Sequence, residues 1–182
     1  GVRVTHNKDR TITLAQPHLI DSILEDLGLL GEKAPKRNPP TSRPLPALST
    51  KLIGPDFEGA PFEYNWEYRS IIGKLNFLEK STRPDIAYAT HQCARFLANH
   101  KRSHGEAVKL IGRYLLGTKD KGLHIKPTQQ HTFECYVDAD YMGNWDKAIA
   151  DRDPNTAKSR YGFVIKYCGV PIFWQSKLQT MV

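Results

Sequence analysis

The chain has 182 residues and carries 26 Lys and Arg against 19 Asp and Glu, a formal net charge of +7. Its mean hydropathy is −0.51, and no apolar run approaches the roughly 18 residues that a membrane span needs, which argues against a transmembrane protein. A hydrophobic fraction of 40% is too high for a wholly disordered chain. Length and composition therefore predict one domain or two small ones.

The first residue, Gly1, lies within a strand-like segment, and no secretory signal is visible. We therefore expect a piece of a longer intracellular protein, in the cytoplasm or nucleus, that is not secreted and has no membrane partner. The three cysteines form no C-x-x-C pair, and their odd number indicates a reducing compartment. We expect all three to be buried as small apolar side chains: Cys93, Cys135 and Cys168.

Two groups of histidine and cysteine are the alternatives for a metal site. Neither has the two close ligand pairs about a loop that zinc sites show, and a chain with seven histidines produces such groups readily. The groups are His91, Cys93, His100 and His104 and, further on, His124, His131 and Cys135.

The first 64 residues predict a hairpin, a helix and a connector. Residues 2–14 alternate about a turn at residues 7–9, which favours a β-hairpin, and Pro17 opens a helix with apolar residues at helical spacing. Seven of the twelve prolines then fall within residues 32–64, so we expect an extended connector there. The connector is either a solvated linker or a basic strap along a nucleic-acid backbone; its cations are Lys33, Lys36, Arg37, Arg43 and Lys51.

Residues 65–127 predict a compact cluster of three antiparallel helices. Asn65 is the expected cap of the first, Arg83 and Pro84 open the second, and Ser103 with Glu106 forms a capping box for the third, which stops at Gly117. Residues 101–126 hold seven Lys and Arg against two Asp and Glu, a net +5. This stretch is either an ordinary solvated face or a surface that binds phosphates. The candidate nucleic-acid-binding residues are Lys101, Arg102, Lys109, Arg113, Lys119 and Lys121.

After Pro127 the hydrophobic period changes from 3.6 to 2, which predicts a separate small sheet in residues 131–182. Asp138 and Asp140 end its first strand. Because residues i and i+2 of a strand share a face, the pair is a candidate metal site, although a turn or cap is the more common role of such a pair. The whole is an α+β fold: an N-terminal hairpin and helix (1–31), the connector (32–64), the helical region (65–127) and a partial sheet (131–182).

Three segments of the helical region resemble copia-type retrotransposon polyproteins in the region between polymerase and RNase H. The family reads approximately Y-R-S-x-x-G-x-L, T-R-P-D-I-x-Y-A and R-Y-L-x-G-T, and this chain has residues 68–75, 82–89 and 113–118 in the same order. Residues 137–141, 158–163 and 174–177 resemble the first three strands of the family's RNase H. The resemblance covers nearly the whole chain and implies the end of the polymerase palm, the thumb and connection region, and the start of RNase H.

The resemblance also implies roles for single residues. Asp138 matches the first metal-binding carboxylate of RNase H, and Asp140 is the weaker candidate ligand of Mg²⁺. The other RNase H carboxylates and the Y-x-D-D aspartates of the polymerase would lie outside residues 1–182. We therefore expect a fragment of an RNA-directed DNA polymerase with RNase H that is inactive alone and holds no Mg²⁺ stably. The alternatives are a non-catalytic module that binds a primer–template duplex, and a relic of a decayed element. The expected partners are nucleic acid and the remainder of the polyprotein.

Overall fold

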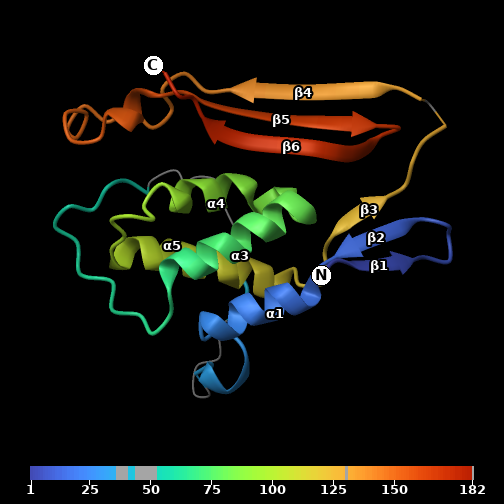
Figure 1. Ribbon diagram of the computed structural model, residues 1–182, viewed down its shortest axis with the longest axis horizontal. Helices are drawn as coiled ribbons and strands as arrows, with labels where there is room; N and C mark the ends of the chain where they lie inside the picture. The colour runs from blue at the N-terminus through green and yellow to red at the C-terminus, as the bar shows by residue number, and fades with distance from the viewer. Residues whose placement is uncertain (36–40, 44–52, 130, 182) are drawn as a thin grey trace. The chain divides into compact units, whose positions relative to one another are not determined.

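The computed structural model describes residues 1–35, 41–43, 53–129 and 131–181. It is a mixed α+β structure, as the sequence predicts, and its helices and strands are labelled in Figure 1. Two compact units separate: the first comprises residues 1–6 and 13–123, and the second comprises residues 7–12 and 124–182.

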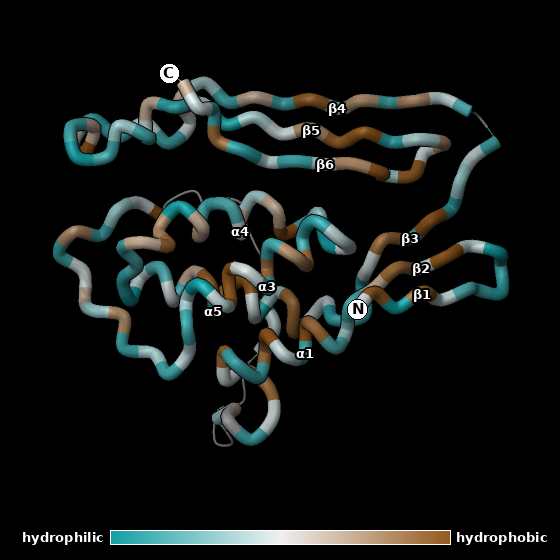
Figure 2. Tube along the Cα trace, viewed as in Figure 1, coloured by the Kyte–Doolittle hydropathy of each residue, from teal (hydrophilic) through white to brown (hydrophobic). Residues whose placement is uncertain are grey.

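The first unit is built on α1 (Pro17–Asp26), α3 (Tyr68–Ser81), α4 (Ala87–Ala94) and α5 (Arg102–Gly117). Each helix buries the residues that recur at helical spacing, since one stripe must leave water for the helix to be stable. Helix α1 belongs to the same core as the three predicted helices. Figure 2 shows hydrophobic residues recurring along these helices between hydrophilic ones. The core includes Ile20, Ile23, Leu24, Ile71, Ile72, Leu75, Leu78, Ile86, Val108, Ile111 and Leu115.

Helix starts differ from the sequence predictions at two points. Helix α3 begins at Tyr68 with Glu67 as its N-cap, so the prediction of Asn65 as the cap is wrong. Helix α5 begins at Arg102 with Lys101 as its N-cap, and the predicted capping box is also wrong because Ser103 donates instead to Asp56, at 2.6 Å. The Pro17 start of α1 and the Gly117 end of α5 are confirmed. Short 3-10 turns lie at Gly31–Lys33 and, before α4, at Pro84–Ile86.

The predicted N-terminal hairpin is confirmed as β1 (Arg3–His6) and β2 (Ile12–Ala15). A third strand, β3 (Leu123–Ile125), completes a sheet of order β1-β2-β3 and was not expected from the sequence. Gly122, just before β3, permits this pairing, because a Cβ at that position would collide with the carbonyl oxygen of Leu14.

The second unit holds an antiparallel sheet of order β4-β5-β6 (Phe133–Ala139, Arg160–Tyr167 and Val170–Leu178). Cys168 and Gly169 join β5 to β6 with φ of 50° and 77°, the left-handed pair that a two-residue hairpin turn requires. A 3-10 turn at Pro154–Ala157 precedes β5. Phe133, Cys135 and Val137 share one face of β4 and are exposed. The expectation that Cys135 is buried is therefore wrong, whereas Cys93 and Cys168 are buried.

Within the part of the chain that the structure describes, no helix is both long and apolar enough to cross a membrane.

Candidate nucleic-acid interface and carboxylate pair

Helix α3 carries an outward face that is basic and has no acidic residue. Arg69, Gly73, Phe77 and Lys80 recur along it at helical spacing, and all four are exposed, Phe77 by 54%. We call these four residues the α3 outer face. The face combines two cations, an aromatic ring and a position without a side chain.

Gly73 has no packing reason among the residues that the structure describes. A glycine within a helix costs about 0.5–1 kcal/mol relative to alanine, yet no described atom lies within 4 Å of a Cβ added at Gly73. The two interior glycines of α5 differ, because a Cβ at Gly105 would meet the Tyr64 ring and one at Gly112 would lie 2.6 Å from Leu29. Gly73 thus leaves the α3 outer face open to close approach.

The other sides of α3 fix its orientation. The Tyr68 hydroxyl donates to the Cys93 carbonyl at 2.9 Å, which ties α3 to α4. The Lys74 ammonium lies 2.6 Å from the Asp26 carboxylate and donates to Ser22 at 2.8 Å, which ties α3 to α1. These polar contacts, with the apolar core beneath, hold the α3 outer face on a rigid element.

The six basic residues singled out from the sequence do not form one cluster. Arg102, Lys109 and Arg113 recur along one stripe of α5, at i, i+7 and i+11. Lys119 is instead paired with Asp21 of α1 at 2.6 Å, and Lys121 is exposed in the loop that follows. Lys101 is the N-cap of α5, where its backbone N–H donates to Nδ1 of His104 at 2.8 Å. Only the α5 stripe therefore remains as a continuous basic surface.

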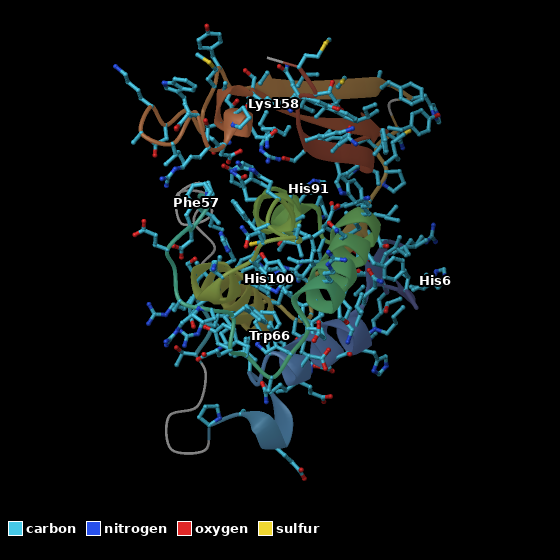
Figure 3. All side chains as sticks on the ribbon, turned by 60° about the vertical axis from the view of Figure 1, so that its left-hand side comes forward. His6, Phe57, Trp66, His91, His100 and Lys158 are labelled. Atoms are coloured by element: carbon cyan, nitrogen blue, oxygen red, sulfur yellow. The ribbon has the colours of Figure 1, made fainter. Side chains whose placement is uncertain are left out.

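Tyr64 sits on that stripe. Its hydroxyl donates to the Glu106 carboxylate, and the Lys109 ammonium lies 4.2 Å from the centre of its ring. Burial and then the bond to Glu106 raise the pKa of Tyr64 to about 12, so the hydroxyl stays protonated as a donor. On its other side the ring stacks on Trp66 at 5.3 Å, within an aromatic cluster that also holds His100 (Figure 3).

Two of the family-like segments meet in a buried polar network. The Arg83 guanidinium is 2% exposed; it donates to the Thr118 carbonyl and hydroxyl at 2.9 and 2.7 Å and pairs with Asp85 at 2.8 Å. Tyr114 donates to the same carboxylate at 2.7 Å. Burial by itself would raise the pKa of Asp85, but the bonds from Arg83 and Tyr114 outweigh it and hold that pKa below its ordinary value. This network cannot be read from the sequence, because its members are separated by up to 35 residues.

Asp138 and Asp140 differ in their surroundings. Asp138 lies on β4 opposite Gly162 and is exposed. One carboxylate oxygen of Asp140 accepts the backbone N–H of Arg160 at 2.6 Å, and the Asp140 N–H donates back to the Arg160 carbonyl at 2.9 Å. Asp140 therefore caps the junction between β4 and β5, the structural role of such a residue after a strand.

The residues present do not fit a site for two Mg²⁺ ions. Such a site needs several carboxylates that hold the ions about 4 Å apart, whereas the described residues contain no group of three His, Cys, Asp or Glu side chains placed to hold a metal ion. The two histidine and cysteine groups named from the sequence are likewise not assembled. His104 is buried with Nδ1 accepting from Lys101 and Nε2 bonded to the Gly54 carbonyl at 2.9 Å.

Three of the chain's relatives are Pol polyproteins of plant transposons. The chain is 33% identical to the retrovirus-related Pol polyprotein from transposon TNT 1-94 of Nicotiana tabacum, in an alignment that covers its whole length. It is 34% identical over 76% of its length to that from transposon RE1 of Arabidopsis thaliana, and 34% identical over 64% to that from transposon RE2 of the same plant.

The chain spans only 13%, 8% and 7% of the length of these three relatives. No family model and no solved structure matches it. Identity of about one third along the whole chain, together with the segments at residues 68–75, 82–89 and 113–118, nevertheless establishes its ancestry. The chain belongs to the family of Pol polyproteins of copia-type retrotransposons.

Proposed function

We propose that the first unit binds a nucleic-acid duplex, a primer–template in the parent reverse transcriptase, through the α3 outer face. The observation that carries this proposal is the open glycine: Gly73 weakens the helix and fills no packing need in the described residues, yet lies beside the exposed ring of Phe77. A position without a side chain allows a partner's backbone to approach the helix closely.

The charges of the α3 outer face favour a phosphate backbone as the partner. Arg69 and Lys80 flank Gly73 and Phe77 along the helix, with no carboxylate on that face to compete for them. Arg and Lys bind phosphates largely without regard to sequence, and an aromatic ring packs against sugars or bases. A rigid helix presenting both is suited to hold a duplex whatever its sequence, as the copying of a template requires.

The chain itself is proposed to be non-catalytic. Asp138 is a single exposed carboxylate, and Asp140 is engaged by the backbone of Arg160. Polymerase and RNase H activity would then belong to the longer polyprotein, where further carboxylates complete the site for Mg²⁺. The proposal places the protein inside the cell with the rest of that polyprotein. Cleavage of an RNA–DNA hybrid in Mg²⁺ by this chain, lost in Asp138→Asn, would overturn the proposal of inactivity.

Duplex binding is tested by fluorescence anisotropy with a labelled 20-base-pair RNA–DNA hybrid and DNA duplex between 50 and 200 mM salt. We expect binding that weakens as the salt concentration rises. In Lys80→Gln the slope of the logarithm of the binding constant against the logarithm of the salt concentration should fall by about one, the size of one phosphate contact. Phe77→Ala should weaken binding about 5-fold or more at every salt concentration, because it removes a packing contact.

Gly73→Leu provides the sharpest variant. The leucine should strengthen the helix, and so raise the melting temperature, while it blocks close approach and weakens binding. Lys147→Gln, an exposed cation of the second unit, is the matched control and should bind like the unchanged chain. Absence of binding at 50 mM salt would contradict the proposal and favour a relic of a decayed element. Undiminished binding in Gly73→Leu and Lys80→Gln would exclude the α3 outer face.

A further inference from the structure

The proline-rich connector contacts α5 near both ends of that helix. Near the end of α5, the Arg43 backbone N–H donates to the Arg113 carbonyl at 3.2 Å, and a Cβ at Gly117 would meet Ser42. At the start of α5, the Gly54 carbonyl bonds to His104 at 2.9 Å. The Ala60 carbonyl accepts the N–H of Arg102 at 3.0 Å. The described pieces of the connector are thus part of the α5 surface.

The α5 stripe carries three cations and one acidic residue, a net positive charge. Arg102, Lys109 and Arg113 spread their charges over about 16 Å at 1.5 Å per residue. Arg43 brings a further exposed cation to the Arg113 end. The only acidic residue of α5 is Glu106, which lies on the same stripe, 4.0 Å from the Lys109 ammonium.

Tyr64 competes with Lys109 for the Glu106 carboxylate. Its hydroxyl gives Glu106 a neutral partner, while its ring offers Lys109 a cation–π contact at 4.2 Å. Glu106 and Lys109 already form an i,i+3 ion pair, but a long one, at 4.0 Å. Without the hydroxyl, Glu106 would turn fully to Lys109 and shorten that pair. A closely ion-paired lysine contributes less to phosphate binding than one whose acid is shared with a tyrosine.

We propose that α5 and the connector together form a second nucleic-acid-binding surface, separate from the α3 outer face, whose effective charge is set by Tyr64. The surface comprises Arg43, Tyr64, Arg102, Lys109 and Arg113. It takes the phosphates of a nucleic-acid backbone, because its cations are spaced along a line and carry the opposite charge. Tyr64 is a positioning residue: it acts through Glu106 and Lys109 and not by contact with the ligand.

The proposal predicts an unusual double-mutant cycle. Tyr64→Phe changes no formal charge, but it should weaken duplex binding several-fold and lower the salt slope by about one, like Lys109→Gln. Glu106→Gln should strengthen binding, and in that background Tyr64→Phe should have no further effect, because the acid it controls is gone. A purely structural role for Tyr64 would lower affinity equally in both backgrounds.

The cycle is measured by anisotropy on the full chain with a labelled duplex, first with the α3 outer face intact and then with Lys80→Gln. Arg43→Gln and Arg113→Gln should each lower the salt slope by about one in both backgrounds. Tyr141→Phe, an 86% exposed tyrosine of the second unit, is the control. Melting temperature and circular dichroism identify any variant that fails to fold.

Four outcomes are decisive. If the unchanged chain binds no duplex, both the proposed function and this inference fail. If it binds, but Tyr64→Phe and Arg113→Gln bind equally well, only the inference fails. If Tyr64→Phe weakens binding equally with and without Glu106→Gln, its role is structural and the proposed control of charge is wrong. Polyglutamate that displaces the duplex from the Lys80→Gln variant at equal charge concentration would overturn nucleic acid as the partner and indicate an acidic protein.

Discussion

Arg83 and Thr118 lie 35 residues apart, yet the Arg83 guanidinium binds both the carbonyl and the hydroxyl oxygen of Thr118. The contact joins the residue before the 3-10 turn that leads into α4 to the residue just after α5. It also supplies positive charge at the C-terminal end of helix α5, the favourable place for a cation.

Loss of this guanidinium should destabilise the first unit strongly. Arg83→Met removes the charged donor from the Thr118 carbonyl, which keeps the N–H of Lys121, and the guanidinium partner from Asp85. We expect a loss of about 2–3 kcal/mol in the free energy of unfolding, as for hydrogen bonds to charged groups. Thr118→Val removes one acceptor and should cost about 1 kcal/mol. Urea unfolding followed by circular dichroism measures both; Arg3→Met, on exposed β1, is the control. Equal stability of Arg83→Met and the control would contradict the role of the network.

The first unit should lose stability in mild acid through His104. Burial holds the pKa of His104 below its ordinary value of 6.5, although Asp56 partly opposes this and His100 adds to it. The unfolded chain therefore binds the proton more readily, and the stability that neutral His104 provides is present above about pH 6.5 and lost as the pH falls toward the folded pKa.

Thermal unfolding between pH 7.5 and 5.5 measures this dependence. His104→Gln should be less stable at pH 7.5 but should show a smaller loss on acidification. His18→Gln, at an exposed position of α1, should keep the full pH dependence. An identical pH profile in His104→Gln would show that other groups are responsible.

Two of the three thiols should differ strongly in their reaction with iodoacetamide. Cys135 is exposed on β4 and should be labelled first, whereas Cys93 is fully buried and burial raises its pKa to about 12, so almost no thiolate forms. Peptide mass spectrometry after labelling at pH 7.5 should find Cys135 modified and Cys93 unmodified until denaturant is added. Early labelling of Cys93 would contradict its place in the helical core.

Two glycines on neighbouring helices should respond oppositely to the same substitution. Gly73→Ala should stabilise the chain by up to about 1 kcal/mol, because the methyl group meets nothing in the described residues and alanine favours helix. Gly112→Ala should destabilise it by about 1–3 kcal/mol, because the new Cβ lies 2.6 Å from Leu29 and 2.7 Å from Leu27. Chemical unfolding of both variants measures the difference, and a change of the same sign in both would exclude this explanation.

Apolar spacing was sufficient to predict the helices and most strands, because burial of one stripe or face dominates their stability. The caps at the starts of α3 and α5 were predicted wrongly. Ser103 shows why, because it bonds to Asp56, 47 residues away, and this contact cannot be read from local sequence. Cys135 shows a similar gap: alternation indicates which residues share a face of a strand, but whether that face is covered depends on the rest of the fold.

The candidate site was only partly visible in the sequence. Local charge identified the α5 stripe, but only three-dimensional contacts reveal that Lys119 is used by Asp21 and that Tyr64 lies between Glu106 and Lys109. For the α3 outer face, the sequence offers one indication, a glycine inside an otherwise regular helix. Only the structure shows that Gly73 faces open space and is not needed for packing in the described residues.

Strand β4 lies at one edge of its sheet with Phe133 73% and Val137 70% exposed. Unpaired backbone groups beside apolar side chains form a template for another strand. The isolated chain should therefore aggregate as its concentration rises. Aggregation should begin with strand pairing at β4 while the helices remain folded. A charge placed at Val137 would keep the chain dispersed without touching either proposed nucleic-acid surface.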